Sequence, residues 1–201
     1  MTSVSPSRPA RIKPVSDPGP EVAATLAKTL SDAHGVPLNI FATLAHHPRL
    51  LKRFNVLGGM FLAHGELPAR ERELVVLRTA WRAGSEYEWG QHVVIGARAG
   101  VTEAEIKAVT RPLAEGGWTG SDSVLLTFTD EVLDHIDVSE EIWKAAREHW
   151  SEAQIIELTM LVGFYRMVAG FLNAVRVERE GELPGWPDGV VRRRGRPAEQ
   201  R

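Results

Sequence analysis

Helix start and stop signals recur along almost the whole chain, and they restrict its fold more than any other feature of the sequence. Between residues 21 and 179, apolar side chains return every three or four positions, which is the spacing of one face of an α-helix. Thr102–Glu105 and Ser151–Gln154 have the capping-box pattern that begins helices, and Gly84 follows a periodic segment as a C-terminal stop. Because no segment shows the alternation of a half-buried strand, the sequence predicts an all-α protein.

The periodic segments also predict the organisation of the chain. They indicate helices at 21–33, 37–47, 49–64, 68–83, 122–136 and 139–150, and further helices beginning at Ser85, Thr102 and Ser151. The segment from Glu73 to Leu77 resembles the segment from Glu157 to Leu161, which indicates a degenerate internal repeat within one domain. We expect an N-terminal arm at 1–20, one helical domain at 21–180, and a solvated tail at 181–201 that contains the run Arg192-Arg193-Arg194.

Composition limits the classes of function. The chain of 201 residues is 43% hydrophobic and 25% charged, which is typical of a globular protein. Its formal net charge of −2 makes nucleic acid and anionic membranes unexpected partners. Its lack of cysteine excludes disulfides, cysteine-ligated zinc and cysteine nucleophiles. Because the N-terminus lacks a signal-like apolar core and no apolar run approaches the roughly 20 residues of a membrane span, we expect a cytoplasmic protein without a membrane partner.

Three ionisable side chains occupy positions where the periodicity calls for apolar ones. On the helix predicted at 68–83, Glu73 lies on the apolar face. On the next helix, Glu88 and His92 are one turn apart and continue into the apolar stripe of Ile95 and Ala99. An apolar pocket that holds a carboxyl group and an imidazole together is a candidate acid/base site.

Each of these residues also has a structural interpretation. Glu73 could form a buried ion pair, with Arg70 or Arg72, or cap a neighbouring helix, or it could be a carboxyl group with a raised pKa that exchanges protons near neutrality. Because Ser85-x-x-Glu88 is a capping-box pattern, Glu88 could bind only a backbone N–H. We place Arg78 on the polar side of its helix.

Other kinds of chemistry find little support. Glu88 and His92 supply only two metal ligands, and the remaining histidines are scattered, so we predict no metal site. The sequence has no nucleophile elbow and no glycine-rich phosphate loop after a strand.

The segments 70–74, 85–92 and 98–106 resemble the carboxymuconolactone decarboxylase / alkyl hydroperoxidase D family, most densely over residues 68–107. The stretches 164–167 and 171–173 are similar to the second half of its longer members. The resemblance implies a helical bundle of the alkyl hydroperoxidase D type. In the peroxidase branch, cysteines would stand at the positions of Ser85 and Glu88, so thiol turnover is excluded here. In the decarboxylase branch, a glutamate precedes a histidine by four residues, as Glu88 precedes His92.

The decarboxylase branch acts on 4-carboxymuconolactone in aromatic catabolism, so the resemblance implies a cofactor-free lyase or isomerase of a small lactone or keto acid. His92 is the predicted proton donor, Glu88 orients it or sets its protonation state, and Glu73, if protonated, donates a hydrogen bond or relays a proton. Tyr87, Trp89 and Arg72 are the predicted substrate contacts. The resemblance also implies a homo-oligomer: a trimer, dimer or hexamer. The alternatives are a peroxidase-like protein that has lost its cysteines and a non-catalytic helical protein that binds a small molecule.

Overall fold

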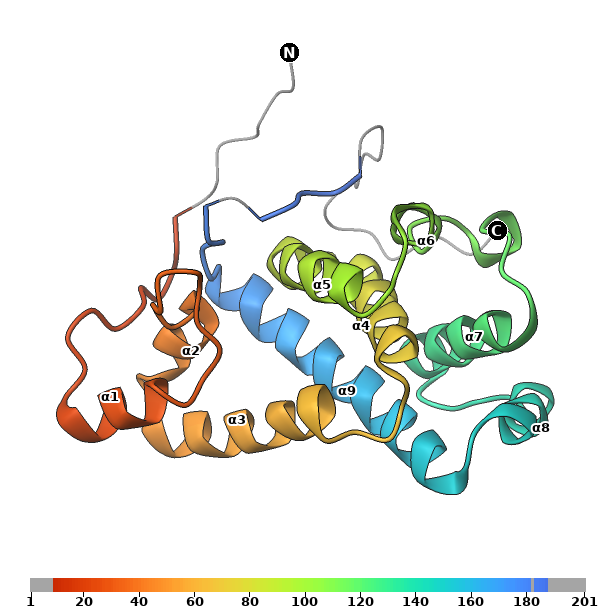
Figure 1. The fold of residues 1–201 in the computed structure, drawn as a ribbon, viewed down its shortest axis with the longest axis horizontal. Coiled ribbons are helices and arrows are strands. Elements are labelled where there is room, and N and C mark those ends of the chain that lie inside the picture. Colours follow the sequence, from red (N-terminus) through yellow and green to blue (C-terminus); the bar gives the residue numbers. More distant parts are fainter. Residues whose placement is uncertain (1–8, 182, 188–201) are drawn as a thin grey trace, which may run out of the picture. The chain divides into compact units, whose positions relative to one another are not determined.

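The computed structural model describes residues 9–181 and 183–187, and within them the all-α prediction is confirmed. These residues contain no named strand, and their only β-type pairing is an isolated bridge between Ser31 and Pro37. The helices, labelled in Figure 1, are α1 (Pro20–Leu26), α2 (Asn39–Leu44), α3 (Pro48–Ala63), α4 (Ala69–Ala83), α5 (Glu86–Arg98), α6 (Glu103–Ala108), the 3-10 turn η1 (Leu113–Glu115), α7 (Gly120–His135), α8 (Glu140–His149) and α9 (Glu152–Val175).

The described residues form two compact units. The first contains the chain up to His64 together with residues 171–181, and the second contains residues 65–170 and 183–187. Helix α9 contributes to both units. The arm and domain boundaries predicted at residues 20 and 181 stay predictions. Most of the predicted tail, including its arginine run, lies outside the described residues, as do residues 1–8 of the arm.

In the first unit, α1 and α2 pack against α3. The helix predicted at 21–33 is too long, because α1 ends at Leu26. The chain then turns through bonds of the i→i+3 type, from Lys28 N–H to Thr25 O and from Thr29 N–H to Leu26 O. The side chain of Asp32 accepts hydrogen bonds from the N–H groups of His34 and Val36 and fixes a turn there. The apolar spacing of the sequence therefore continues beyond Leu26, although local hydrogen bonds end the helix there.

In the second unit, α4 lies at the centre and packs on both α5 and α7, while α7 packs on α8 (Figure 1). Residues Leu74 to Leu77 of α4 are completely buried. The prediction that Arg78 faces solvent is wrong: its guanidinium is buried, pairs with Asp130 of α7 at 2.6 Å, and donates to two backbone carbonyls. A helix covered on two sides has no polar side, so its arginine must be paired inside.

By length and composition, helix α9 is long and apolar enough to cross a membrane. The sequence had predicted no apolar run of that length. Its most apolar window has a mean hydropathy of 1.6, and 56% of that window is buried inside the protein. The core helix of a globular protein passes the same test, so this finding is weak evidence for a membrane span. Residence in the cytoplasm stays a prediction.

Candidate active site

The turn between α4 and α5 positions the candidate site. Gly84 ends α4 with a left-handed backbone (φ 66°), a conformation that glycine adopts without steric cost. Ser85 then caps α5, since its Oγ accepts a hydrogen bond from the N–H of Glu88 at 3.4 Å. The two helices run side by side after this turn (Figure 1), so the buried faces of both contribute to one cluster.

Glu73 and His92 meet at the centre of this cluster. The Nδ1 atom of His92 lies 2.6 Å from Oε2 of Glu73, and both side chains are buried. Both residues point inward, as the periodicity predicted, and the hydrogen bond between them is direct. The other oxygen of Glu73 accepts a hydrogen bond from Nε of Arg72 at 2.8 Å. The ion-pair partner of Glu73 is therefore Arg72 and not Arg70.

Of the alternatives open for Glu73, the structure shows the buried ion pair and not the raised pKa. Burial alone would raise the pKa of this carboxyl group, but the charge and hydrogen bond of His92 and the hydrogen bond of Arg72 outweigh burial, and the net pKa is lowered. Glu73 is therefore a stable carboxylate. Because a carboxylate only accepts hydrogen bonds, Nδ1 of His92 carries the hydrogen of their contact. Glu73, rather than Glu88, orients the imidazole.

Glu88 has a different environment. Its two carboxyl oxygens are buried and have no hydrogen-bond partner among the described residues. The capping interpretation fails for this side chain, because only the Ser85 half of the box forms. At Thr102, by contrast, both halves form, and Glu105 returns a hydrogen bond to the capping backbone N–H. Burial raises the pKa of Glu88 well above its ordinary value, so the folded protein favours its protonated form.

Tyr165 of α9 completes the cluster, although the sequence analysis did not identify it as a site residue. Its ring meets the imidazole of His92 edge to face, with centroids 4.9 Å apart and an angle of 87° between the planes. Burial, then the nearby charge of Glu73, raises the pKa of Tyr165 well above its ordinary value. Only its membership of the stretch 164–167 in the family resemblance could have drawn attention to it.

The three residues predicted to contact the substrate have different environments. Arg72 is buried and bonded to Glu73. Trp89 is completely buried, packs against the rings of Trp81 and Trp186, and donates its indole N–H to the carbonyl of Gly185. Tyr87 is also buried. The substrate roles of all three stay predictions, and the contacts of Trp89 are those of a core residue.

The cluster can exchange protons at two places. The carboxylate of Glu73 fixes the imidazole so that its second nitrogen, Nε2, is free to accept or release a proton. One helical turn away, Glu88 offers a carboxyl group whose pKa is raised by burial. Two carboxyl groups whose surroundings push their pKa values in opposite directions are the usual sign of separate acid and base roles. Within the described part of the chain, no group of three or more acidic, histidine or cysteine side chains is placed to hold a metal ion.

Comparison with known proteins agrees with these features. The carboxymuconolactone decarboxylase family model matches residues 48–130. No curated protein matches the sequence. An uncharacterized peroxidase-related protein from Silicibacter sp. TM1040 has a similar structure, with a TM-score of 0.75, 15% identity, and coverage of 91% of this chain and 97% of that one. The alkylhydroperoxidase AhpD core protein from Ralstonia eutropha JMP134 gives a TM-score of 0.73, 20% identity, and coverage of 86% and 94%.

A third similar structure is the debrominase Bmp8, determined in complex with 2,3,4-tribromopyrrole. Its TM-score is 0.70 at 16% identity, and the match covers 87% of this chain and 94% of that one. Identities this low show a shared fold and no more. The match of residues 48–130 to the family model agrees with the resemblance seen in the sequence, and the chain has the all-α fold of AhpD-like proteins.

Proposed function

We propose that the protein is a cofactor-free acid/base enzyme, a lyase or isomerase that acts on a small lactone or keto acid. The observation that carries the proposal is the direct hydrogen bond from His92 to the ionised Glu73, beside the unpartnered carboxyl group of Glu88. The match of residues 48–130 to the carboxymuconolactone decarboxylase family model supports the class of reaction.

In the proposed chemistry, Glu73, His92 and Glu88 have separate roles. Glu73 holds Nδ1–H of His92, so Nε2 takes or gives the proton at a carbon atom next to the substrate carbonyl. Glu88, as a neutral acid, donates a hydrogen bond to the carbonyl oxygen on which negative charge develops. In a decarboxylation, the electrons of the breaking C–C bond pass to that oxygen as CO2 leaves. The resulting enolate then receives a proton on carbon from His92.

A non-catalytic binding protein is the second candidate, and one observation favours it. Glu73, Glu88, His92 and Tyr165 are all more than nine-tenths buried, so a substrate reaches them only if neighbouring residues move. A peroxidase cycle based on thiols is not a candidate, because the chain contains no cysteine.

Turnover assays with matched variants test the proposal. The purified protein is incubated with a panel of β-keto acids and unsaturated carboxylated lactones, and CO2 release and loss of ultraviolet absorbance are measured. We expect turnover of at least one compound, its loss in His92→Ala, and a strong reduction in Glu88→Gln. Binding of a panel member by calorimetry without any turnover would support the binding protein instead. Turnover that is equal in the wild type and His92→Ala would refute the proposed site.

A further inference from the structure

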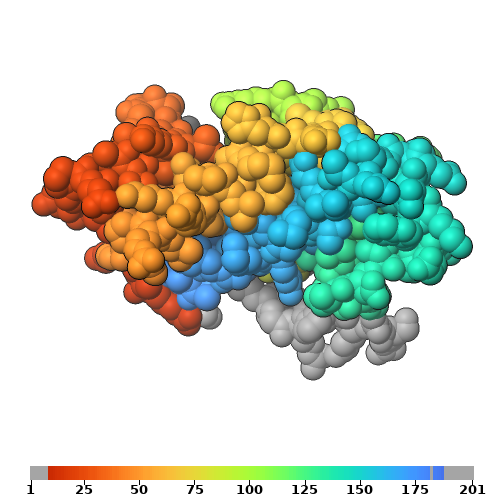
Figure 2. Space-filling view, turned by 90° about the horizontal axis from the view of Figure 1, so that it is seen from below, coloured from red at the N-terminus to blue at the C-terminus, as the bar shows by residue number. Residues whose placement is uncertain are grey.

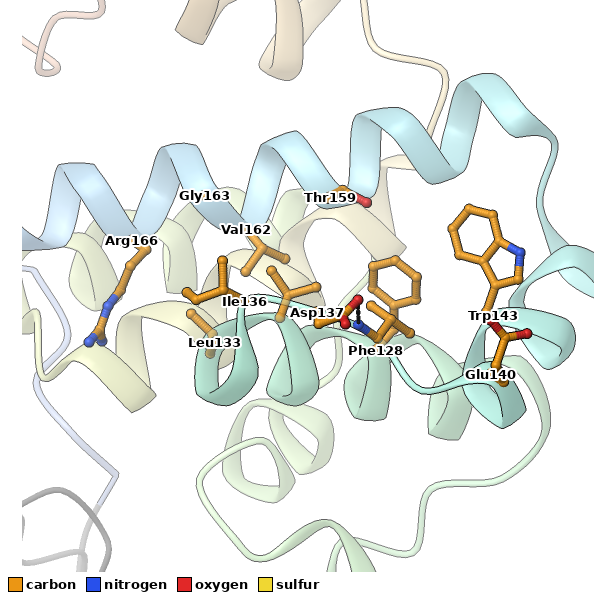
Figure 3. A pocket seen from close by; sticks show the side chains of 12 residues that line it. Phe128, Leu133, Ile136, Asp137, Glu140, Trp143, Thr159, Val162, Gly163 and Arg166 are labelled. Atoms are coloured by element: carbon orange, nitrogen blue, oxygen red, sulfur yellow. Dashed lines mark hydrogen bonds between the residues drawn. The ribbon is translucent and has the colours of Figure 1, made fainter.

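An apolar groove in the second unit carries unequal charge along its length. The groove has a volume of about 590 Å³ and lies between α7, α8 and α9, with Ile136 in its apolar centre. Its charged lining residues are Asp137 near the middle, Glu140 at the end beside Trp143, and Arg166 at the opposite end (Figure 3). Two carboxylates against one guanidinium give the groove a net negative charge, and that charge lies toward the Trp143 end.

The acidic end of the groove has the groups that bind an arginine side chain. Asp137 accepts a hydrogen bond from the backbone N–H of Val138 at 2.8 Å, and within the described residues neither Asp137 nor Glu140 forms an ion pair. The indole ring of Trp143 is 40% exposed beside them. Carboxylates bind a guanidinium through paired hydrogen bonds, and an indole face stacks on it. This end therefore fits a segment that carries arginine.

Ile136 indicates that the apolar centre of the groove is covered by something. It follows α7 with a left-handed backbone (φ 59°), which is strained for a β-branched residue, and its side chain is 87% exposed. Glycine at this position would avoid both costs. Across the groove, Gly163 of α9 has open space where a Cβ atom would stand. Figure 2 shows α9 (cyan to blue) at the surface beside α7 and α8 (teal). An exposed isoleucine in a strained conformation is explained if another segment buries it.

The tail of the chain has the complementary composition. The apolar pair Val190-Val191 is followed directly by the run Arg192-Arg193-Arg194, which the proposed chemistry does not use. Two β-branched side chains match the apolar centre of the groove, and the guanidinium groups match its carboxylates and indole ring. Because Arg166 repels the run, the arginines belong at the acidic end and the valines over the centre.

The segment 183–187 brings the tail to the same unit as the groove. The ring of Trp186 packs on that of Trp81 in α4, with centroids 5.2 Å apart. Helix α4 packs on α7, and α7 lines the groove, so the path from Trp186 to the groove crosses about two helix diameters, or ~20 Å. Arg192 follows Trp186 by six residues, and an extended chain of that length spans about 20 Å. The arginine run is therefore within reach of the groove.

We propose that residues 190–194 of the chain's own tail dock in the groove between α7, α8 and α9. The two valines cover Ile136, and the arginines pair with Asp137 and Glu140. Because the tail is tethered close to the groove, its effective concentration there is on the order of millimolar, and a weak contact is sufficient to keep the groove occupied. This docking is independent of the proposed acid/base chemistry.

Disulfide trapping tests the docking in the full chain, because the protein has no cysteine of its own. Val191→Cys is combined with Gly163→Cys, which adds a thiol inside the groove where a Cβ atom has open space. The matched control combines Val191→Cys with Gly170→Cys, two turns further along the same side of α9, where the space is equal but the groove has ended. A tail free in solution would reach both thiols. In a glutathione buffer, the Gly163 pair should close within one chain at least about tenfold faster than the Gly170 pair.

Charge variants of the Gly163 pair identify the docking partners. Serine in place of the three arginines 192–194 should slow closure to the rate of the Gly170 pair, and Asp137→Lys/Glu140→Lys should do the same. Glu148→Lys makes an equal change at an exposed position of α8 outside the groove and should leave the rate unaltered. Exchanging the charges, with arginine at positions 137 and 140 and glutamate at positions 192–194, should restore fast closure, which a misfolded variant would not show.

The proposal is overturned if the Gly163 and Gly170 pairs close at the same rate, or if the charge variants do not slow the Gly163 pair. It is also overturned if the disulfide joins two chains, since the occupant of the groove would then be the tail of a second copy. Failure of the Gly163 pair to close at all would overturn it as well and would leave the groove to a basic segment of another protein.

Discussion

The buried carboxyl group of Glu88 makes a quantitative prediction about stability and pH. Burial raises its pKa well above the ordinary value of a glutamate, whereas in the unfolded chain the side chain returns to water. Between these two pKa values, the folded protein holds a proton that the unfolded chain has lost. The free energy of unfolding therefore falls as the pH rises, by about 1.4 kcal/mol for each pH unit, until the pH passes the folded-state pKa.

Glu88→Gln should remove this slope. Glutamine has nearly the same shape and no charge to desolvate, so the variant should match the wild type near pH 4.5 and become progressively more stable relative to it above that pH. Urea unfolding at intervals from pH 5 to pH 8, followed by circular dichroism at constant salt, measures the difference directly. The predicted result is a gap between the two curves that widens with pH, by at most about 1.4 kcal/mol per pH unit, and stops widening once the pH passes the folded-state pKa of Glu88.

Glu105→Gln is the matched control. Glu105 also occupies the N3 position of a capping-box pattern, but its carboxylate is bonded to Arg70 and to the Thr102 backbone. Although burial would raise the pKa of Glu105, these bonds lower it, so its removal should cost stability and produce no gain at higher pH. Parallel curves for Glu88→Gln and the wild type from pH 5 to pH 8 would refute the assignment of a protonated, unpartnered Glu88.

Three further results are expected. His92→Ala should keep the helical circular dichroism spectrum and lower turnover by on the order of a hundred- to ten-thousand-fold; normal specific activity in the folded variant would make His92 a structural residue. In the wild type, the ionised Glu73 stabilises the fold above the ordinary carboxyl pKa, and this stability is lost as the pH falls through the lowered folded-state pKa. The free energy of unfolding of Glu73→Gln should therefore depend less on pH between pH 5 and pH 3 than that of the wild type. An unchanged pH dependence would contradict the lowered pKa. Arg78→Ala should cost about 3 kcal/mol by urea unfolding, because it breaks a buried ion pair, and the more exposed Arg82→Ala should cost clearly less.

The sequence predicted the fold class and the inward direction of the site residues for a definite physical reason. Periodicity places Glu73 and His92 on the buried sides of two successive helices, and the Gly84 stop makes those helices neighbours. Periodicity does not show which side chains of other helices a residue contacts. It could not decide between two arginine partners for Glu73, and it assigned the orientation of His92 to Glu88 because that residue is close in sequence.

The failures have a common origin in tertiary contacts. The assignment of Arg78 to solvent assumed that α4 has a polar side, but α7 covers that side and supplies Asp130. Tyr165 joins the cluster from a helix that begins far along the chain, so no local pattern connects it with His92. The raised pKa expected for Glu73 depended on burial without partners, a condition that the structure meets at Glu88 instead.

The position of Glu88 explains how one helical frame can support different chemistry. By the family resemblance, Glu88 stands where the peroxidase branch has a cysteine, at the first turn of a helix. A thiol in that position is favoured as a thiolate, because the helix N-terminus stabilises negative charge. For the completely buried carboxyl group of Glu88, burial exceeds that stabilisation and keeps the proton bound. The substitution thus replaces a reactive anion by a neutral acid, while the Glu73–His92 pair beside it keeps a nitrogen free to exchange a proton. With Ser85 and Glu88 at the two cysteine positions, the same helical frame would in this way hold the proposed acid/base site in place of a redox site.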